Sequence, residues 1–229
     1  MIILALDTTT AEGSTAVIRD GLVLAEQVGD ANVTHGQRLP ADLAHVLDLA
    51  SVRIDDVEVI AVAAGPGSFT GLRVGIATAQ GLAMARSRLV VPVSALEALA
   101  RAAVNATTPI AAWMDAHRGQ VFSELFTADG LTVLVPAESS LPDEILAGWG
   151  ARAPATAVFI GDGAVRYRAE ILARFGDAAR IIEPPPLAGI IGQIAAAHPE
   201  RAVLPHAVVP IYVRKPDAEL ARLRRLAGG

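Results

Sequence analysis

The stretch that decides the fold is IILALDTTTAEGSTAVIRDGLVLAEQV, residues 2–28. Its first apolar run, Ile2–Leu6, ends at Asp7-Thr8-Thr9-Thr10. Two further strand-like segments, Ser14–Arg19 and Leu22–Val28, are joined by Asp20-Gly21. An Asp-Gly pair between two such segments is a strong hairpin signal. The sequence therefore predicts three consecutive strands at the start of the chain.

Helices and strands alternate through the rest of the first half. Pro40 precedes apolar residues spaced as on one face of a helix, so we expect it in the first helical turn. The expected elements are this helix with Leu43, Val46, Leu47 and Ala50 on one face, a strand at Val57–Ala63, the loop Gly65–Gly71, a helix at Leu72–Ala85, a strand at Leu89–Val93 and a helix opened by the capping box Ser94–Glu97.

The second half repeats this order, βββαβαβα. Its expected elements are strands at Pro109–Met114, Gln120–Thr127 and Leu131–Val135, a helix near Leu141–Glu144, a strand at Ala157–Ile160, one helix at Ala164–Phe175, a strand at Arg180–Ile182 and a helix at Leu187–Ala197. Two such units predict a duplicated α/β fold with mixed sheets. We place the domains at 1–105 and 106–213, with a final helix in 214–229 that returns to the first domain.

The composition of the chain excludes or disfavours several classes of site and partner. The chain has 229 residues, a net charge of −5 and no cysteine, which excludes disulfides, thiolate metal sites and cysteine nucleophiles. An acidic protein is a poor binder of nucleic acid by itself, because phosphate neutralisation supplies most of that affinity. The longest stretch without a charged residue, 184–199, is too short to cross a membrane. We expect a cytoplasmic protein that does not bind membranes.

The sequence lacks several common catalytic motifs, and in each case a specific residue of the motif is missing or displaced. A Walker A loop needs Gly-Lys-Ser/Thr, but the only lysine, Lys215, precedes a proline. The glycines of Gly65–Gly71 are spaced one residue too far for a dinucleotide fingerprint, and Ser68 follows Gly67 directly, unlike a nucleophile elbow. The five histidines contain no zincin pattern. We therefore expect no catalytic residue and no metal site.

Two segments remain candidates for binding a nucleotide or phosphate. Asp7, Thr8 and Thr9 end the first strand, and Gly161, Asp162 and Gly163 end a strand of the second half. Ligands of α/β sheets collect beyond the carboxyl ends of strands, so we expect weak ATP or ADP binding between these segments at most, with no cofactor required. An ordinary turn stabilised by the Asp7 and threonine side chains explains the first segment equally well.

The helix at Leu72–Ala85 is apolar on all sides for three turns. Such a helix is buried all round, either by its own chain or by another subunit. With the helix after Pro40, we expect it to form an interface for a partner or a second copy. The expected interface residues are Leu39, Leu43, Val46, Leu47, Leu72, Val74, Ile76 and Gln80.

Several segments resemble one protein family. They are Ile3–Thr9, the string Gly-Pro-Gly-Ser-Phe-Thr-Gly-Leu-Arg-Val-Gly at 65–75, Asp115–Val121, Gly161–Ala164 and Pro210–Arg214. These segments closely resemble the TsaB (YeaZ) family, and the resemblance extends over essentially the whole chain. One departure is His35-Gly36-Gln37, where many relatives have His-Ser-Glu.

The resemblance implies a fold, a role and partners. The fold is the duplicated actin-like (ASKHA, ribonuclease H-like) fold with two βββαβα-type domains. The role is that of a non-catalytic scaffold in the bacterial machinery that makes threonylcarbamoyladenosine beside the tRNA anticodon. The partners are the paralogue TsaD, which holds the metal and transfers threonylcarbamoyl, and the ATPase TsaE. From the two apolar helices we also expect a homodimer of the protein alone, and we expect contact with tRNA only through the complex. Alternatives from other classes are an ATP-dependent phosphotransferase of the same fold and a metal-dependent glycoprotease.

Overall fold

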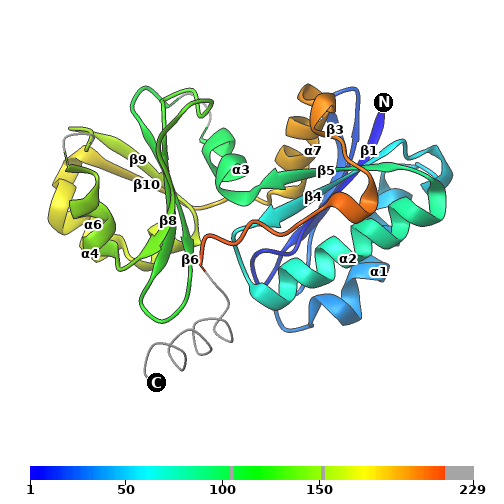
Figure 1. Ribbon diagram of the computed structural model, residues 1–229, viewed down its shortest axis with the longest axis horizontal. Coiled ribbons are helices and arrows are strands. Elements are labelled where there is room, and N and C mark those ends of the chain that lie inside the picture. Colours follow the sequence, from blue (N-terminus) through cyan, green and yellow to red (C-terminus); the bar gives the residue numbers. More distant parts are fainter. Residues whose placement is uncertain (104–105, 151–152, 215–229) are drawn as a thin grey trace, which may run out of the picture.

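A computed structural model describes residues 1–103, 106–150 and 153–214, which form two mixed five-stranded sheets (Figure 1). The first sheet has the strand order β3-β2-β1-β4-β5, and the second has the order β10-β9-β6-β7-β8. The strands are β1 (Ile2–Asp7), β2 (Ser14–Arg19), β3 (Leu22–Val28), β4 (Val59–Gly65), β5 (Leu89–Ser94), β6 (Ile110–Asp115), β7 (Val121–Phe126), β8 (Val133–Ser140), β9 (Ala157–Ile160) and β10 (Ala179–Ile182).

The two sheets have the same topology. In each, the first three strands form an antiparallel meander, and the next two strands lie parallel to the first strand on its other side. Strand β6 thus takes the place that β1 has in the first sheet. The predicted duplication of an α/β unit is confirmed.

Seven α-helices connect the strands within the described residues. They are α1 (His35–Leu49), α2 (Phe69–Arg86), α3 (Ala95–Ala102), α4 (Pro142–Gly148), α5 (Asp162–Arg166), α6 (Arg168–Phe175) and α7 (Ala188–Ala197). Two predictions were wrong in detail. Helix α1 begins before Pro40, because Gln37 and Arg38 already donate to the Thr34 carbonyl and close the first turn. The helix expected at Ala164–Phe175 is two helices, because Tyr167 leaves helical angles with its side chain buried.

Alternate residues of β1 face different helices. Leu4 and Leu6 belong to a core that lies under α1 and α2. Ile3 and Ala5 face the opposite side, where the core continues through α7 and α3 into the second sheet. This alternation follows from the two-residue period of a strand buried on both faces. One continuous apolar core therefore joins the two halves.

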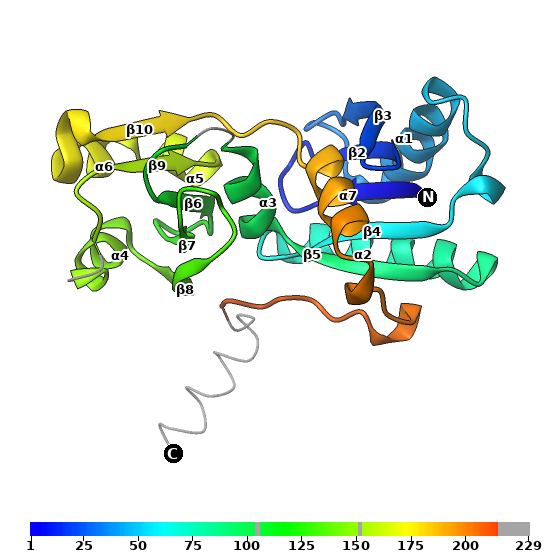
Figure 2. The ribbon, with the colours of Figure 1, turned by 90° about the horizontal axis from the view of Figure 1, so that it is seen from above.

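Helix α7 follows the second sheet in sequence but packs on the first sheet, against β1, β2 and β4 (Figure 2). Its N-terminus is fixed there by the Ser14 hydroxyl, which accepts from the amides of Leu187 and Ala188 at 3.2 and 3.0 Å. The Glu26 carboxylate accepts from the Gly189 amide at 2.7 Å. Helix α3, conversely, follows the first sheet but packs against β6 and β7 as well as β4 and β5.

The predicted domain boundaries therefore need a correction. Residues 106–213 do not form one unit, because α7 and the segment after it cover the first sheet. The helix expected in 214–229 lies outside the described residues, apart from Arg214. None of the helices in the described part of the chain is long and apolar enough to cross a membrane.

Residues 202–214, here called the strap, run from the first sheet to the second half (Figure 1). Val203 pairs with Val90 beside the edge of the first sheet. Gln80 on α2 donates to the carbonyls of Pro205 and Val208 at 3.0 and 3.3 Å. The Ile211 amide donates to the Ala64 carbonyl at 2.7 Å. At its far end, Arg214 bonds the loop between β6 and β7, so the strap connects the two halves.

Glu124 on β7 lies at the junction between the halves. Burial, with repulsion from Glu97 on α3, raises the pKa of Glu124 to about 7. Glu97 itself is held by Arg201, whose Nη1 lies 2.9 Å from both carboxylate oxygens. The folded protein therefore binds a proton at Glu124 that the unfolded chain releases near pH 4.5, the ordinary pKa of a glutamate. Between pH 4.5 and 7, the contribution of this group to stability falls as the pH rises.

We predict that the Glu124→Gln substitution changes the pH dependence of stability. At pH 5 the folded protein holds Glu124 protonated, so glutamine has little effect on the free energy of unfolding. At pH 8 the substitution removes a buried charge, and the variant is more stable than the unsubstituted protein. Urea unfolding at both pH values measures the difference. Glu183→Gln, at an exposed position, is the matched control, and equal effects of the two variants at pH 8 would contradict the assignment.

Candidate functional site

The carboxyl ends of the central strands of both sheets open into one cleft between the halves. Asp7 ends β1, Gly65 ends β4, Asp115 ends β6, and Gly161 follows β9. Two adjoining cavities occupy the cleft. One, of about 470 Å³, lies between the loop 66–70, the loop after β6 and the end of the strap. The other, of about 640 Å³, extends along the loop after β1 and the start of α1. Ligand sites in this kind of sheet lie at such an edge.

Asp7 is buried at the end of β1 and organises the loop after it. Its Oδ1 accepts from the amide of Thr9 at 2.8 Å and from the Thr9 hydroxyl at 2.6 Å. Burial raises the pKa of Asp7, although the bonds from Thr9 oppose this. Thr8 points the other way, under α2, where its hydroxyl donates to the Gly71 carbonyl at 2.8 Å. The hydroxyls of this turn are thus bonded within the protein.

The second predicted segment faces the first. Asp162 Oδ1 accepts from the amides of Asp115 and Gly163 at 3.1 and 2.8 Å, and burial raises the pKa of Asp162. Gly161 and Gly163 lie directly on the backbone of β6, where a side chain at either position would overlap the main chain. Their lack of a side chain therefore serves helix–strand packing.

The structure brings Asp7 and Asp162 to the same small cavity, which has a volume of about 50 Å³ and is closed by Pro184, Pro185 and Pro186. Ligand pockets are commonly about 300–1,000 Å³. Two facing carboxylates also repel a phosphate unless a cation lies between them. Within the described residues, no group of three or more histidine or acidic side chains is arranged to hold a metal ion. The larger volume of the cleft lies beside this gap rather than in it.

The predicted interface residues lie in different environments in the structure. Six of them are buried. Five lie in the core between the first sheet and helices α1 and α2, namely Leu39, Leu43, Val46, Leu47 and Ile76. The sixth, Leu72, lies next to Gly65 at the wall of the cavity of about 470 Å³. The expectation that these six contact a partner directly was therefore wrong, because the chain itself covers them. Val74 is half-buried and lines the larger cavity, and Gln80 bonds the strap. The two helices do lie side by side, as predicted (Figure 1).

His35 and Arg38 support the loop after β1 from α1. His35 Nε2 lies 2.9 Å from the Thr10 carbonyl oxygen, and burial lowers the pKa of this histidine. Arg38 donates to the carbonyl of Glu12 and pairs with Asp42. Sequence reasoning missed both roles, since neither side chain stands near the loop in sequence. Although Gly36-Gln37 stands where many relatives have Ser-Glu, His35 contacts this loop.

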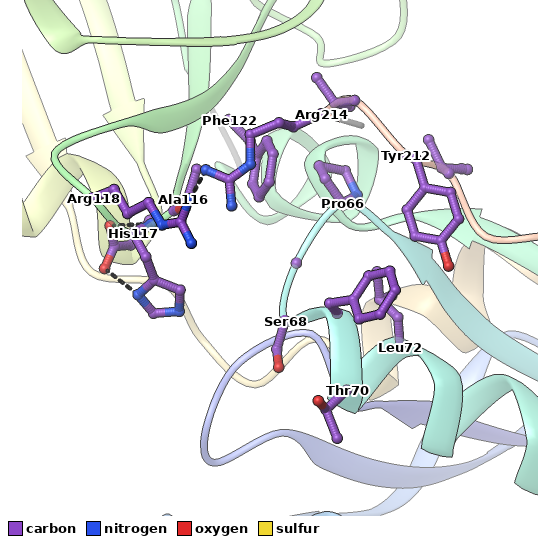
Figure 3. A pocket seen from close by; sticks show the side chains of 15 residues that line it. Pro66, Ser68, Thr70, Leu72, Ala116, His117, Arg118, Phe122, Tyr212 and Arg214 are labelled. Atoms are coloured by element: carbon purple, nitrogen blue, oxygen red, sulfur yellow. Dashed lines mark hydrogen bonds and ion pairs between the residues drawn. The ribbon is translucent and has the colours of Figure 1, made fainter. Parts of the chain in front are cut away.

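Apart from Leu72, the residues that line the cavity of about 470 Å³ were not among the site residues expected from the sequence. Figure 3 shows Arg118, Phe122 and Arg214 on one side, with Tyr212 and Leu72 on the other. His117 and Arg118 have positive φ angles of 58° and 57°, a backbone conformation that side chains adopt at a cost. The Asp115 carboxylate accepts from the His117 amide at 3.0 Å and holds this turn. Arg118 and Gly119, with φ angles of 57° and 79°, are the central residues of the hairpin turn between β6 and β7, which the Gln120 amide closes by donating to the His117 carbonyl at 3.0 Å. Tight hairpin turns of this kind require positive φ angles.

The chain is similar in sequence and in fold to known proteins. The chain is 34% identical over 152 residues to the tRNA threonylcarbamoyladenosine biosynthesis protein TsaB of Bacillus subtilis, which covers 65% of this chain and 64% of that protein. The solved structure of YeaZ from Pseudomonas aeruginosa superposes with a TM-score of 0.75 at 27% identity, covering 92% of this chain and 100% of that one. The chain belongs to the TsaB/YeaZ family.

The chain also matches a family model, a further relative and a more distant solved structure. A family model described as tRNA N6-adenosine threonylcarbamoyltransferase (TsaD) matches residues 29–140. An uncharacterized protein of Mycobacterium leprae is 32% identical over 95% of this chain. The chain spans 56% of that relative and 64% of the Bacillus subtilis TsaB. The ROK hexokinase of Thermus thermophilus shares the fold, with a TM-score of 0.50 at 14% identity, so the duplicated sheets are those of the actin-like fold.

The close approach of α2 to the loop after β1 leads to a stability prediction for this TsaB/YeaZ chain. A methyl group at Gly71 or Gly75 would overlap Thr8, whereas Gly81 on the same helix has no atom within 4 Å of that position. We expect Gly71→Ala and Gly75→Ala each to lower the free energy of unfolding by about 1–3 kcal/mol. Gly81→Ala should raise it by up to about 1 kcal/mol, because alanine favours the helix.

Urea unfolding of the three variants measures these changes. Gly81→Ala is the matched control, since it makes the same substitution in the same helix. Equal stability of all three variants would show that α2 does not rest on Thr8.

Proposed function

We propose that the protein is a non-catalytic subunit of the bacterial machinery that makes threonylcarbamoyladenosine in tRNA, and that it binds and activates a TsaD paralogue. Membership of the TsaB/YeaZ family is the observation that carries the proposal. The sequence lacks the HxxxH metal motif of TsaD, since its histidines stand at positions 35, 45, 117, 198 and 206. The partner therefore supplies the metal and the transfer chemistry, and TsaE supplies ATP hydrolysis.

The surface that supports this role is the outer side of α1 and α2. Beyond the buried core residues, this side exposes Ala41, Ala44 and Leu49 of α1 together with Ala77, Gly81 and Met84 of α2. Met84 is 67% exposed and Leu49 is 56% exposed. Small residues let another helix approach closely, and the two larger ones supply apolar area. We propose this α1–α2 face as the surface that binds TsaD.

The same face accounts for a homodimer of the protein alone. A pair of helices that meets its own copy does so with two-fold symmetry. The homodimer and the TsaD complex then use one surface and exclude each other. In this proposal, tRNA is reached only through the complex, in agreement with the acidic net charge of −5.

We predict that Ala77→Glu and Met84→Glu weaken binding to the TsaD paralogue of the same organism by at least about tenfold, which corresponds to ~1.4 kcal/mol. Each variant would place an unpaired carboxylate in the interface. Both positions are exposed in the monomer, so folding should be retained. Isothermal titration calorimetry with purified TsaD measures the affinity, and sedimentation measures the homodimer.

Leu131→Glu is the matched control. Leu131 is 55% exposed and lies in the turn between β7 and β8 of the second half, away from α1 and α2. Circular dichroism confirms the fold of each variant. If the α2 variants bind TsaD as tightly as the control does, the α1–α2 face is not the binding surface. If the unsubstituted protein does not bind TsaD at all, the proposed function is wrong.

A further inference from the structure

We propose that the surface that binds the TsaD paralogue extends from the α1–α2 face onto the strap, and that exposed apolar side chains of the strap pack against TsaD. This inference rests on the proposed function, because it takes TsaD as the partner. It adds a second element to the binding surface, and that element lies far from α1 and α2 in the sequence.

The α1–α2 face is small for a stable interface by itself. Stable complexes bury about 800 Å² and roughly 20–30 residues on each partner. Four of the six residues of the face are alanine or glycine, and only Leu49 and Met84 have large side chains. A partner that binds this face therefore needs further contacts on a neighbouring surface.

The strap adjoins this face along α2. It lies on the side of α2 that is away from α1 (Figure 2). Gln80 donates to two carbonyls of the strap and fixes it against the helix. Met84 follows Gln80 by one helical turn, so it lies on the same side of α2. The α1–α2 face and the strap therefore adjoin each other near Met84.

Large apolar side chains of the strap are exposed. Val209 is 69% exposed and Leu204 is 57% exposed, and Ile211 and Tyr212 are exposed as well. Residues 202–213 contain no Asp, Glu, Lys or Arg, in a chain in which 19% of residues are charged. An exposed apolar surface of this kind marks a site of interaction with another molecule.

The backbone of the strap is fixed before any partner binds. Its start pairs with β5, and the Ile211 amide donates to the Ala64 carbonyl at 2.7 Å. Val208 is buried with the core residues of α1 and α2, and the next residue, Val209, is left outside. A surface that is already ordered loses little conformational entropy on binding, which favours affinity.

The opposite flank of the α1–α2 face is polar. Beside β3, Asp42 of α1 accepts from Gln27 at 3.1 Å and pairs with Arg38. The apolar extension of the face therefore lies on the strap side. Since the strap continues the surface proposed for TsaD and supplies the apolar area that this surface lacks, TsaD is the occupant.

The test is calorimetric titration of full-length variants with the purified TsaD paralogue of the same organism. Val209→Glu and Leu204→Glu should each weaken binding at least about tenfold, because each places a charge in an apolar contact. Val209→Lys should weaken binding to a similar extent, since burial opposes a charge of either sign. The Leu131→Glu control should change the affinity by less than about twofold. Circular dichroism confirms the fold of each variant.

Amide hydrogen exchange of the complex is an independent test that needs no variant. Exchange in peptides that cover residues 202–214 should slow at least about threefold when TsaD is added, because the partner covers the strap. Peptides that cover the turn between β7 and β8 should exchange at an unchanged rate.

Three results would overturn the proposal. The first is TsaD binding by both glutamate variants of the strap at the affinity of the control. The second is a loss of affinity in Val209→Glu but not in Val209→Lys, which indicates long-range repulsion rather than contact. The third is sedimentation that shows loss of the homodimer in the strap variants while their TsaD affinity is unchanged, which assigns the strap to a second copy. Failure of the unsubstituted protein to bind TsaD contradicts the proposed function itself, so the two proposals fail by different results.

Discussion

The exchange of helices between the two halves is the constraint on which the rest of the structure depends. A mixed sheet buried on both faces needs helices on both sides. The first half provides α1 and α2 for one face of its sheet, but the other face is covered by α7 from the end of the second half. In return, α3 packs on the second sheet. Neither half is complete without a helix that follows the other sheet in sequence, so the core is continuous.

This exchange also determines the shape of the cleft. Because Ser14 and Glu26 hold the start of α7, the prolines before α7 close the gap between Asp7 and Asp162. Open volume is left on the other side of the loop 66–70, where the strap ends. The cleft of this actin-like fold is thus narrow at its centre and wider at one side. Arg214 and Tyr212 lie at the wider side because the strap is bonded to β4 and to the loop after β6.

Helix α2 contributes both to the cleft and to the proposed TsaD-binding face. The N-terminus of α2 lines the cavity at the cleft, and the outer side of its later turns forms the α1–α2 face. The inner side of α2 rests on Thr8 through Gly71 and Gly75. Helix α2 therefore contacts the sheet and the cleft, and in the proposed complex it also contacts the partner. This explains its composition, which has no charged residue between Arg73 and Arg86.

The sequence by itself determined the order of elements, their duplication and the family. Hairpin signals such as Asp20-Gly21 and helix-starting signals such as Ser94–Glu97 are local, and in the structure Ser94 caps α3 through the Glu97 amide. Tertiary structure decided which sheet each helix covers, because apolar residues such as those of α7 fit either sheet. It also decided that Leu39 and Ile76 are core residues, since a helix apolar all round does not reveal what buries it. The cavity wall of Phe122, Tyr212 and Arg214 joins positions far apart in sequence, and only the folded strap brings them together.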